Sequence, residues 1–145
     1  MAGVLAIAHT PPTTVPENTS VKDVVQAMVQ NRVGACAVVA GETLRGIFTE
    51  RDLMVKVVAQ GRDPAKTQVR DVMTTAVEPI SPDASSTRAL RIMSERHFRH
   101  MPVCDGQRRV IGILSLRNVL HRLLDKTSEE LDSLEAFLLA DGPGG

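Results

Sequence analysis

Thr49 and Asp52 form a polar pair whose types and spacing suit two kinds of chemistry. The pair follows the apolar run at residues 46–48, and its hydroxyl and carboxyl groups stand three residues apart. One interpretation is a helix cap, in which each side chain satisfies a free backbone amide of the first helical turn. The other is ribose binding, because a carboxylate accepts two hydrogen bonds and a vicinal diol supplies two donors. The pair alone leaves both open, and caps are the commoner use.

A second constellation is the basic pair Arg99 and His100, which stands directly before an apolar run. Arginine offers a forked donor and histidine can add a charge-assisted hydrogen bond, so the pair could clamp a phosphate. The alternative is two exposed basic residues at the boundary of a strand.

Other chemistries find little support in the sequence. His97 and His100 are three residues apart, but a strand is expected to begin between them and no carboxylate–histidine cluster accompanies them. A metal site is therefore not expected. No Gly-x-Ser-x-Gly pattern accompanies the serines, so the sequence does not predict an enzyme.

The sequence contains an internal repeat, which helps to assign these residues to helices and strands. Shifting the chain by 65 residues aligns Val15 with Ile80 and Met28 with Met93, and a shift of 66 then aligns residues 46–52 with residues 112–118. Such agreement in order over two segments indicates two copies of one structural unit.

The two copies carry different polar groups at matching positions. Thr49 and Asp52 fall on Ser115 and Asn118, whereas Arg99 falls on a glycine. The first copy therefore supplies the carboxylate and the second supplies the cations. Asn118 can hydrogen-bond a diol only without charge, so the site built on Asp52 is expected to be the stronger.

Each copy has the pattern of a β-α-β-β-α unit, and we predict an α+β fold. Two such units, too small to be stable alone, should pack sheet against sheet with pseudo-twofold symmetry and leave clefts between them. The first helix has apolar residues at helical spacing over residues 21–29. The corresponding residues of the second copy are Ala89, Leu90, Ile92, Met93 and His97.

Four segments follow from the repeat. Residues 1–60 form the first repeat, 61–68 a linker, 69–124 the second repeat and 125–145 a C-terminal helix with a flexible tail. Thr127 and Glu130 form a capping box that should begin this extra amphipathic helix, on which Leu131 lies. The helix either packs back on its own domain or provides a self-association surface.

Composition narrows the partners. The chain of 145 residues has no net charge and only three aromatic residues, which disfavours nucleic acid binding through stacked bases. Cys36 and Cys104 lie in apolar runs and are expected to be buried thiols in a reducing compartment. The N-terminus lacks the basic region of a signal peptide, and no apolar stretch is long enough for a membrane, so we expect a cytoplasmic protein.

Three motifs resemble those of the cystathionine-β-synthase (CBS) domain family, whose members occur as tandem pairs. They are V-x-D-V-M-T at residues 69–74, R-H-h-P-V at residues 99–103 and G-h-h-[ST]-x-x-D at residues 46–52, where h is apolar. The resemblance covers about residues 4–124. The first copy departs from the V-x-D-V-M-T pattern, and His9 stands where Thr74 does in the second.

The resemblance implies a regulatory module that requires no cofactor and binds an adenosine-containing ligand such as AMP, ADP, ATP or S-adenosylmethionine. It also implies a homodimer with an unknown protein partner. The alternative is an interaction module whose pockets are vestigial. By this resemblance the nucleotide-binding residues are Thr49, Asp52, Thr74, Arg99, His100, Pro102, Ser115 and Asn118.

Overall fold

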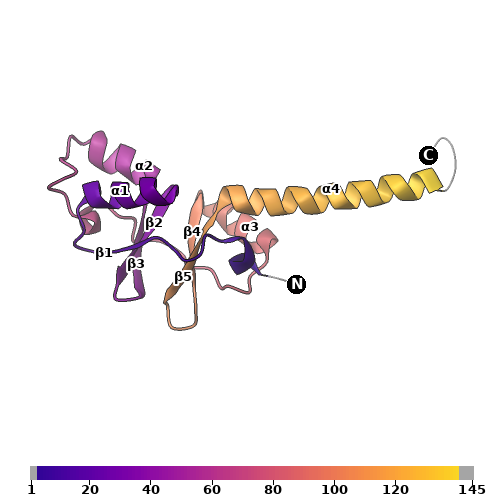
Figure 1. Cartoon of the computed structure of the whole chain (residues 1–145), viewed down its shortest axis with the longest axis horizontal. Coiled ribbons are helices and arrows are strands. Elements are labelled where there is room, and N and C mark those ends of the chain that lie inside the picture. The colour runs from indigo at the N-terminus through magenta and orange to yellow at the C-terminus, as the bar shows by residue number, and fades with distance from the viewer. Residues whose placement is uncertain (1–2, 141–145) are drawn as a thin grey trace.

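The structure, a computed structural model, describes residues 3–140 and contains two repeats (Figure 1). The first has the predicted β-α-β-β-α order, whereas the leading strand of the second is reduced to a single bridge between Ile80 and Val103. The predicted α+β class is confirmed. The first repeat comprises the 3-10 helix η1 (Val4–Ile7), β1 (Thr14–Pro16), α1 (Val21–Asn31), β2 (Ala35–Ala40), β3 (Thr43–Thr49), α2 (Glu50–Asp52) and the π-helix η2 (Leu53–Val58). The second comprises the 3-10 helix η3 (Val69–Asp71), α3 (Ser86–Arg96), β4 (His100–Cys104), β5 (Val110–Ser115) and α4 (Leu116–Ala140).

The leading segment of each repeat pairs with the sheet of the other repeat. Thr74 and Ile47 exchange backbone hydrogen bonds of 2.8 and 2.9 Å, and His9 and Ile113 exchange bonds of 2.8 and 3.2 Å. The two bridges are related by the sequence offsets of 65 and 66 residues, so the pseudo-twofold symmetry is built into the backbone pairing. Because of this exchange, each sheet needs a segment of the other repeat.

The apolar core has three parts. One cluster fills the first repeat around Phe48, and a second fills the other repeat around Met101. A third cluster lies between the sheets and includes Ala37, Ile47 and Ile113. The predicted sheet-against-sheet packing therefore joins the repeats through the third cluster.

The corresponding helices of the two repeats, α1 and α3, end in the same way, and each has a basic residue at its C-cap. Arg32 and His97 directly follow α1 and α3 as their C-cap residues, with φ values of 56° and 59° in the left-handed region. The expectation that His97 belongs to the apolar face of its helix is wrong, because the chain leaves the helix there to reach β4. Left-handed geometry costs a residue with a Cβ about 1 kcal/mol, so asparagine or glycine would suit these positions.

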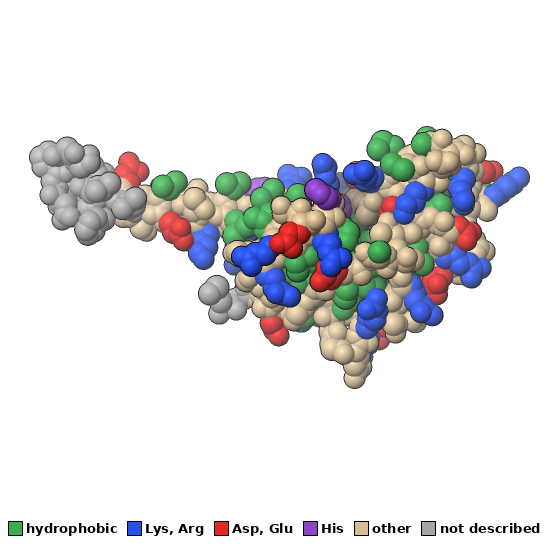
Figure 2. Space-filling view, turned by 180° about the vertical axis from the view of Figure 1, so that it is seen from behind, with side chains coloured by type: hydrophobic (Ala, Val, Ile, Leu, Met, Phe, Trp, Pro, Cys, Tyr) green, Lys and Arg blue, Asp and Glu red, His purple; other side chains and the backbone are tan. Residues whose placement is uncertain are grey.

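The C-terminal helix is present, but it does not begin at Thr127. α4 runs without a break from Leu116, so the final helix of the second repeat and the predicted extra helix are one element that projects from the body (Figures 1 and 2). No glycine or proline interrupts the chain between these residues, and a T-x-x-E pattern is also compatible with a helix interior. Residues 141–145, the expected flexible tail, lie outside the described residues. Among residues 3–140, no helix combines the length and apolarity needed to cross a membrane.

The two cysteines are free and buried, as predicted. Burial raises the pKa of the Cys36 thiol to about 12 and that of Cys104 to about 11. Because the thiolate is the reactive form, we expect both thiols of the folded protein to resist Ellman's reagent at pH about 8 and to react fully in denaturant. Rapid labelling of the folded protein would contradict this burial.

Candidate functional site

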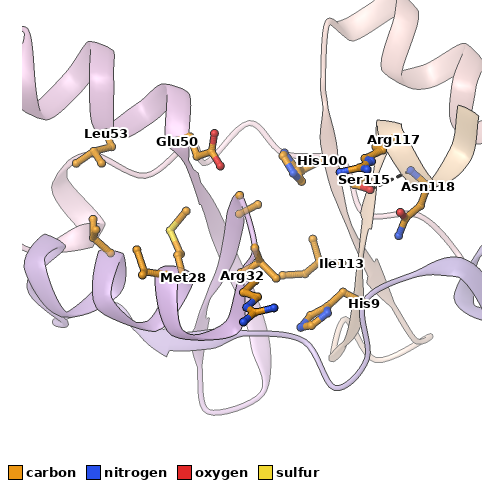
Figure 3. Close-up of a pocket in the computed structure, with 15 residues that line it drawn as sticks. His9, Met28, Arg32, Glu50, Leu53, His100, Ile113, Ser115, Arg117 and Asn118 are labelled. Carbon is orange, nitrogen blue, oxygen red and sulfur yellow. Dashed lines mark hydrogen bonds between the residues drawn. The ribbon is translucent and has the colours of Figure 1, made fainter. Parts of the chain in front are cut away.

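A cleft of about 670 Å³ opens between the two repeats (Figure 3). One wall is apolar and comes from α1 and the start of η2, where Val25, Met28 and Leu53 line it. The opposite wall is polar and comes from the second repeat and the leading segment of the first. Its side chains are His9, His100, Ser115, Arg117 and Asn118, and Arg32 and Glu50 also line the cleft.

Gly34 marks the place where the two walls approach each other. A Cβ atom at this position would lie 2.8 Å from Glu50 Oε1 and 3.4 Å from His100 Cε1. The same position in the second repeat holds Arg99. Gly34 has no side chain that could bind a ligand, but its lack of a Cβ atom leaves room between Glu50 and His100.

The charge of the lining is predominantly basic. Arg32, Arg117, His9 and His100 line the cleft, and Glu50 is the single acidic side chain among its lining residues. Such an arrangement in a partly enclosed site attracts anions.

His100 is the most perturbed titratable group of the cleft. Burial lowers its pKa because it disfavours the imidazolium, Glu50 opposes this effect, and Arg99 adds to the lowering. The neutral imidazole is therefore favoured near neutral pH, and an anion placed beside it would raise its pKa again.

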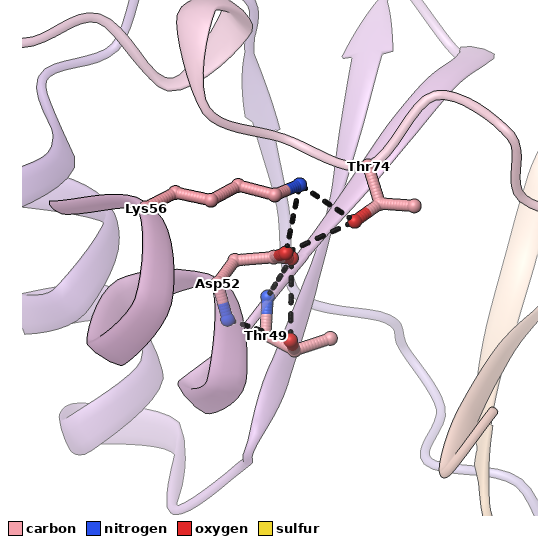
Figure 4. Close-up of polar contacts among 4 residues, drawn as sticks. All are labelled: Thr49, Asp52, Lys56 and Thr74. Carbon is pink, nitrogen blue, oxygen red and sulfur yellow. Dashed lines mark hydrogen bonds and ion pairs between the residues drawn. The ribbon is translucent and has the colours of Figure 1, made fainter. Parts of the chain in front are cut away.

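A second polar group surrounds the buried carboxylate of Asp52, which is 6% exposed (Figure 4). Oδ2 accepts hydrogen bonds from the amide and the hydroxyl of Thr49, at 3.0 and 3.2 Å. Oδ1 accepts a bond of 3.0 Å from Thr74 Oγ1 and forms an ion pair of 3.0 Å with Lys56 Nζ. Lys56 also donates to Thr74 Oγ1 at 3.1 Å. A carboxylate has about four acceptor positions, and all of them are occupied here.

Of the two interpretations of the Thr49–Asp52 pair, the helix cap is present. The Thr49 hydroxyl accepts from the Asp52 amide at 3.2 Å, and Asp52 reaches back to the Thr49 amide. In the second repeat the Ser115 hydroxyl accepts a hydrogen bond of 3.1 Å from the backbone amide of Asn118. The side-chain amide of Asn118 does not reach back to Ser115 but donates to the Ile7 carbonyl at 2.8 Å.

The predicted site residues fall into separate places. His100, Ser115 and Asn118 line the cleft, whereas Thr49, Asp52 and Thr74 form the hydrogen-bonded group beside Lys56. Arg99 lines a second hollow of about 440 Å³ at the base of α4, which shares His100 and Ser115 with the cleft, and Pro102 is buried within β4. Ribose binding by Asp52 stays a prediction.

Several residues of the cleft and of the group around Asp52 were missed by sequence reasoning. Arg32 and Glu50 gave no signal beyond their charge. Arg117 aligns with Arg51 in the repeat, and Lys56 stands four residues after Asp52, the spacing of an ion pair on one helix face. Among the described residues, no three His, Cys, Asp or Glu side chains come together as metal ligands.

The CBS domain family model matches residues 4–59 and 69–125. The chain belongs to the CBS domain family. The CBS domain-containing protein YhcV of Bacillus subtilis is 34% identical over 116 residues, which cover 80% of this chain and 81% of that protein. The mitochondrial CBS domain-containing protein CBSX3 of Arabidopsis thaliana is 36% identical over 124 residues, 82% of this chain and 60% of its own length.

Solved CBS structures share the fold. A putative signal-transduction protein with CBS domains from Burkholderia ambifaria superposes with a TM-score of 0.78 at 32% identity. The match covers 86% of this chain and 95% of that one. The CBS domain pair of protein MJ0100, solved in complex with 5′-methylthioadenosine and S-adenosylmethionine, has a TM-score of 0.78 at 25% identity. It covers 87% of this chain and 98% of its own.

Proposed function

We propose that this CBS pair is a regulatory binding module rather than a catalyst, and that it binds an adenine nucleotide such as AMP, ADP or ATP in the cleft between its repeats. The observation that carries the proposal is the cleft itself, which combines an apolar wall with a polar wall and is lined by four basic side chains, those of His9, Arg32, His100 and Arg117. The adenosine ligands of the MJ0100 pair support this ligand class and keep S-adenosylmethionine as a candidate.

The two walls of the cleft suit different parts of a nucleotide. Val25, Met28 and Leu53 offer an apolar surface for the base, and Ser115 and Asn118 offer hydrogen bonds to the ribose. The basic residues would then face the phosphates. Because both repeats contribute, a ligand that binds one arrangement of the repeats more tightly shifts the population toward it, and an unknown protein partner would sense this shift.

Asp52 is a second possible ribose-binding residue, but binding there would cost more free energy than binding at Asn118. A diol would have to displace Thr74 or Lys56 from Oδ1, and each displaced contact offsets part of the new one. We therefore place the principal site at Asn118, which reverses the order expected from the sequence.

A thermal-shift screen with AMP, ATP, S-adenosylmethionine and NAD tests the proposal. A ligand at about 100 times its Kd stabilises the folded protein by about 2.7 kcal/mol and raises Tm by several degrees. Ribose 5-phosphate serves as the control that lacks the base. No shift with any adenosine ligand at millimolar concentration would overturn the proposal.

The pKa of His100 predicts how nucleotide binding depends on pH. A bound phosphate favours the imidazolium and raises a pKa that burial holds low, so binding takes up a proton. Affinity should therefore rise as pH falls from about 8 to about 6, through the range where histidine titrates. Calorimetry of wild type and His100→Gln isolates this effect, because titration of the phosphate is common to both. A constant affinity ratio across this range would contradict it.

The second candidate function is an interaction module with vestigial pockets. It is favoured by one observation, that Asp52 and Asn118 are both hydrogen-bonded within the chain. In that case the screen gives no shift while partner binding survives Asp52→Ala. A cytoplasmic location and a homodimer stay predictions, and one relative is named as mitochondrial.

A further inference from the structure

The hollow of about 440 Å³ at the base of α4 adjoins the cleft but has a lining of its own. His100, Ser115 and Arg117 line both cavities, and Figure 3 shows them close together on the second-repeat side of the cleft. Arg99, His121 and three leucines line the hollow alone. Its volume lies in the range of small-molecule sites, so the hollow is large enough to hold a ligand.

The apolar part of this lining is a row of leucines on one side of α4. Leu116, Leu120 and Leu124 follow each other at intervals of four residues, so they lie on the same face of the helix. The row is about 12 Å long at the rise of an α-helix. Leu120 and Leu124 are 41% and 65% exposed. The row therefore offers an uncovered apolar strip on which an extended hydrocarbon chain of medium length can lie.

The polar part of the lining is basic and gathers at the start of α4. Arg99 precedes β4, His100 begins that strand, and Arg117 lies in the first turn of the helix. None of the described residues that line the hollow is acidic. Among residues 3–140, neither Arg99 nor Arg117 forms an ion pair. Both guanidinium groups can therefore bind an anion through forked hydrogen bonds.

The two ends of the leucine row differ in charge. Arg117 lies at its start, whereas Asp125 and Glu129 follow its far end and are exposed. A negatively charged head group is attracted to the first end and repelled from the second. A ligand therefore lies with its charge at the start of α4 and with its apolar chain pointing toward Leu124.

The symmetry-related surface of the first repeat differs in charge at two positions. Glu50 stands where the second repeat has Leu116, and Gly34 stands where it has Arg99. An anion at that surface would meet a carboxylate and would lack one of the two arginines. The anion site therefore belongs to the second repeat alone, and the first repeat supplies matched control positions.

We propose that the hollow at the base of α4 binds an aliphatic carboxylate, with its head group on Arg99 and Arg117 and its chain along the leucine row. Such a molecule is a second input to the module, beside the nucleotide. Because His100, Ser115 and Arg117 line both cavities, the two ligands compete for the same side chains, and each weakens the binding of the other by the same factor. This competition rests on the proposed nucleotide site, whereas binding of the carboxylate does not.

The histidine imidazole signals in an NMR titration with octanoate test the site. His121 lines the hollow alone, His100 lines both cavities, His9 lines only the cleft, and His97 belongs to neither lining. We expect saturable shifts of the His121 and His100 signals, with His9 and His97 unchanged. Acetate, which lacks the chain, and octanol, which lacks the charge, should each bind about tenfold more weakly or worse. No saturable shift of His121 at millimolar octanoate, or an equal affinity for octanol, overturns the proposal.

Paired variants in the two repeats separate contacts in the hollow from general effects, and all four positions are exposed. Arg99→Gln should weaken octanoate binding about tenfold, because it removes hydrogen bonds to a charged group. Arg51→Gln removes the same charge from the first repeat and should leave the affinity unchanged. Leu124→Ser should weaken binding about threefold through lost apolar contact, whereas Val58→Ser, at a position 66% exposed, should not. Equal losses within either pair overturn the proposal, and neither comparison depends on nucleotide binding.

Discussion

Replacing Asp52 with alanine is expected to lower the free energy of unfolding by about 3 kcal/mol, from a lost helix cap and lost hydrogen bonds to a charged group. The carboxylate is buried and holds Thr49, Thr74 and Lys56 together. Its loss loosens the start of α2 and the contact of that helix with the leading segment of the second repeat. Urea denaturation followed by circular dichroism measures the change.

Asp23→Ala is the matched control for this prediction. Asp23 occupies the same third position of α1, where Ser20 caps its amide at 3.1 Å, but its side chain is exposed. Its replacement should cost less than about 0.5 kcal/mol, as is usual for surface positions. Similar losses in both variants would show that the buried network around Asp52 contributes little.

The second large effect is expected for the cations of the cleft. Arg32→Asn and Arg117→Ala should each weaken nucleotide binding about tenfold, since a hydrogen bond to a charged group contributes about 1.5 kcal/mol or more. Asparagine suits the left-handed backbone of Arg32, so the fold is spared. Isothermal calorimetry with the nucleotide selected by the thermal screen measures both affinities.

Arg108→Asn is the control for the charge change. Arg108 also has a positive φ, of 63°, but it lies in the turn between β4 and β5, away from the lining of the cleft. Its affinity for nucleotide should match that of wild type. An equal loss in all three variants would indicate attraction by the net charge of the protein instead of contacts in the cleft.

Local sequence patterns predicted the local structure well. The offsets of 65 and 66 residues reappear as the bridges of Thr74 with Ile47 and of His9 with Ile113. The cap of Thr49 and Asp52 was also predictable, because both partners lie within one helical turn. The T-x-x-E pattern at Thr127 misled because its residues occur in helix interiors as well as at helix starts.

Contacts between distant residues were out of reach of the same patterns. The Asp52–Thr74 bond joins residues 22 positions apart, and the Asn118–Ile7 bond joins residues 111 positions apart. These hydrogen-bond partners depend on how the two repeats pack against each other, and the spacing of residues within one element does not indicate that packing. They decide that the amide of Asn118 lines the open cleft while the carboxylate of Asp52 is enclosed.

The basic pair Arg99 and His100 shows a related limit. Sequence reasoning assigned both to one phosphate clamp. Both line the hollow at the base of α4, but only His100 also lines the cleft between the repeats. Arg99 precedes β4 and His100 begins it, so adjacency in sequence does not bring Arg99 into the cleft that His100 lines.

The central claim is that an adenine nucleotide occupies the cleft between the repeats, and the histidine imidazole signals in an NMR titration with AMP test it most directly. The chain has four histidines; His9 and His100 line the cleft, whereas His97 ends α3 outside it. The account predicts saturable shifts of the His9 and His100 signals with His97 unchanged. Saturation that leaves His9 and His100 unmoved, or no shift of either at millimolar AMP, would contradict it.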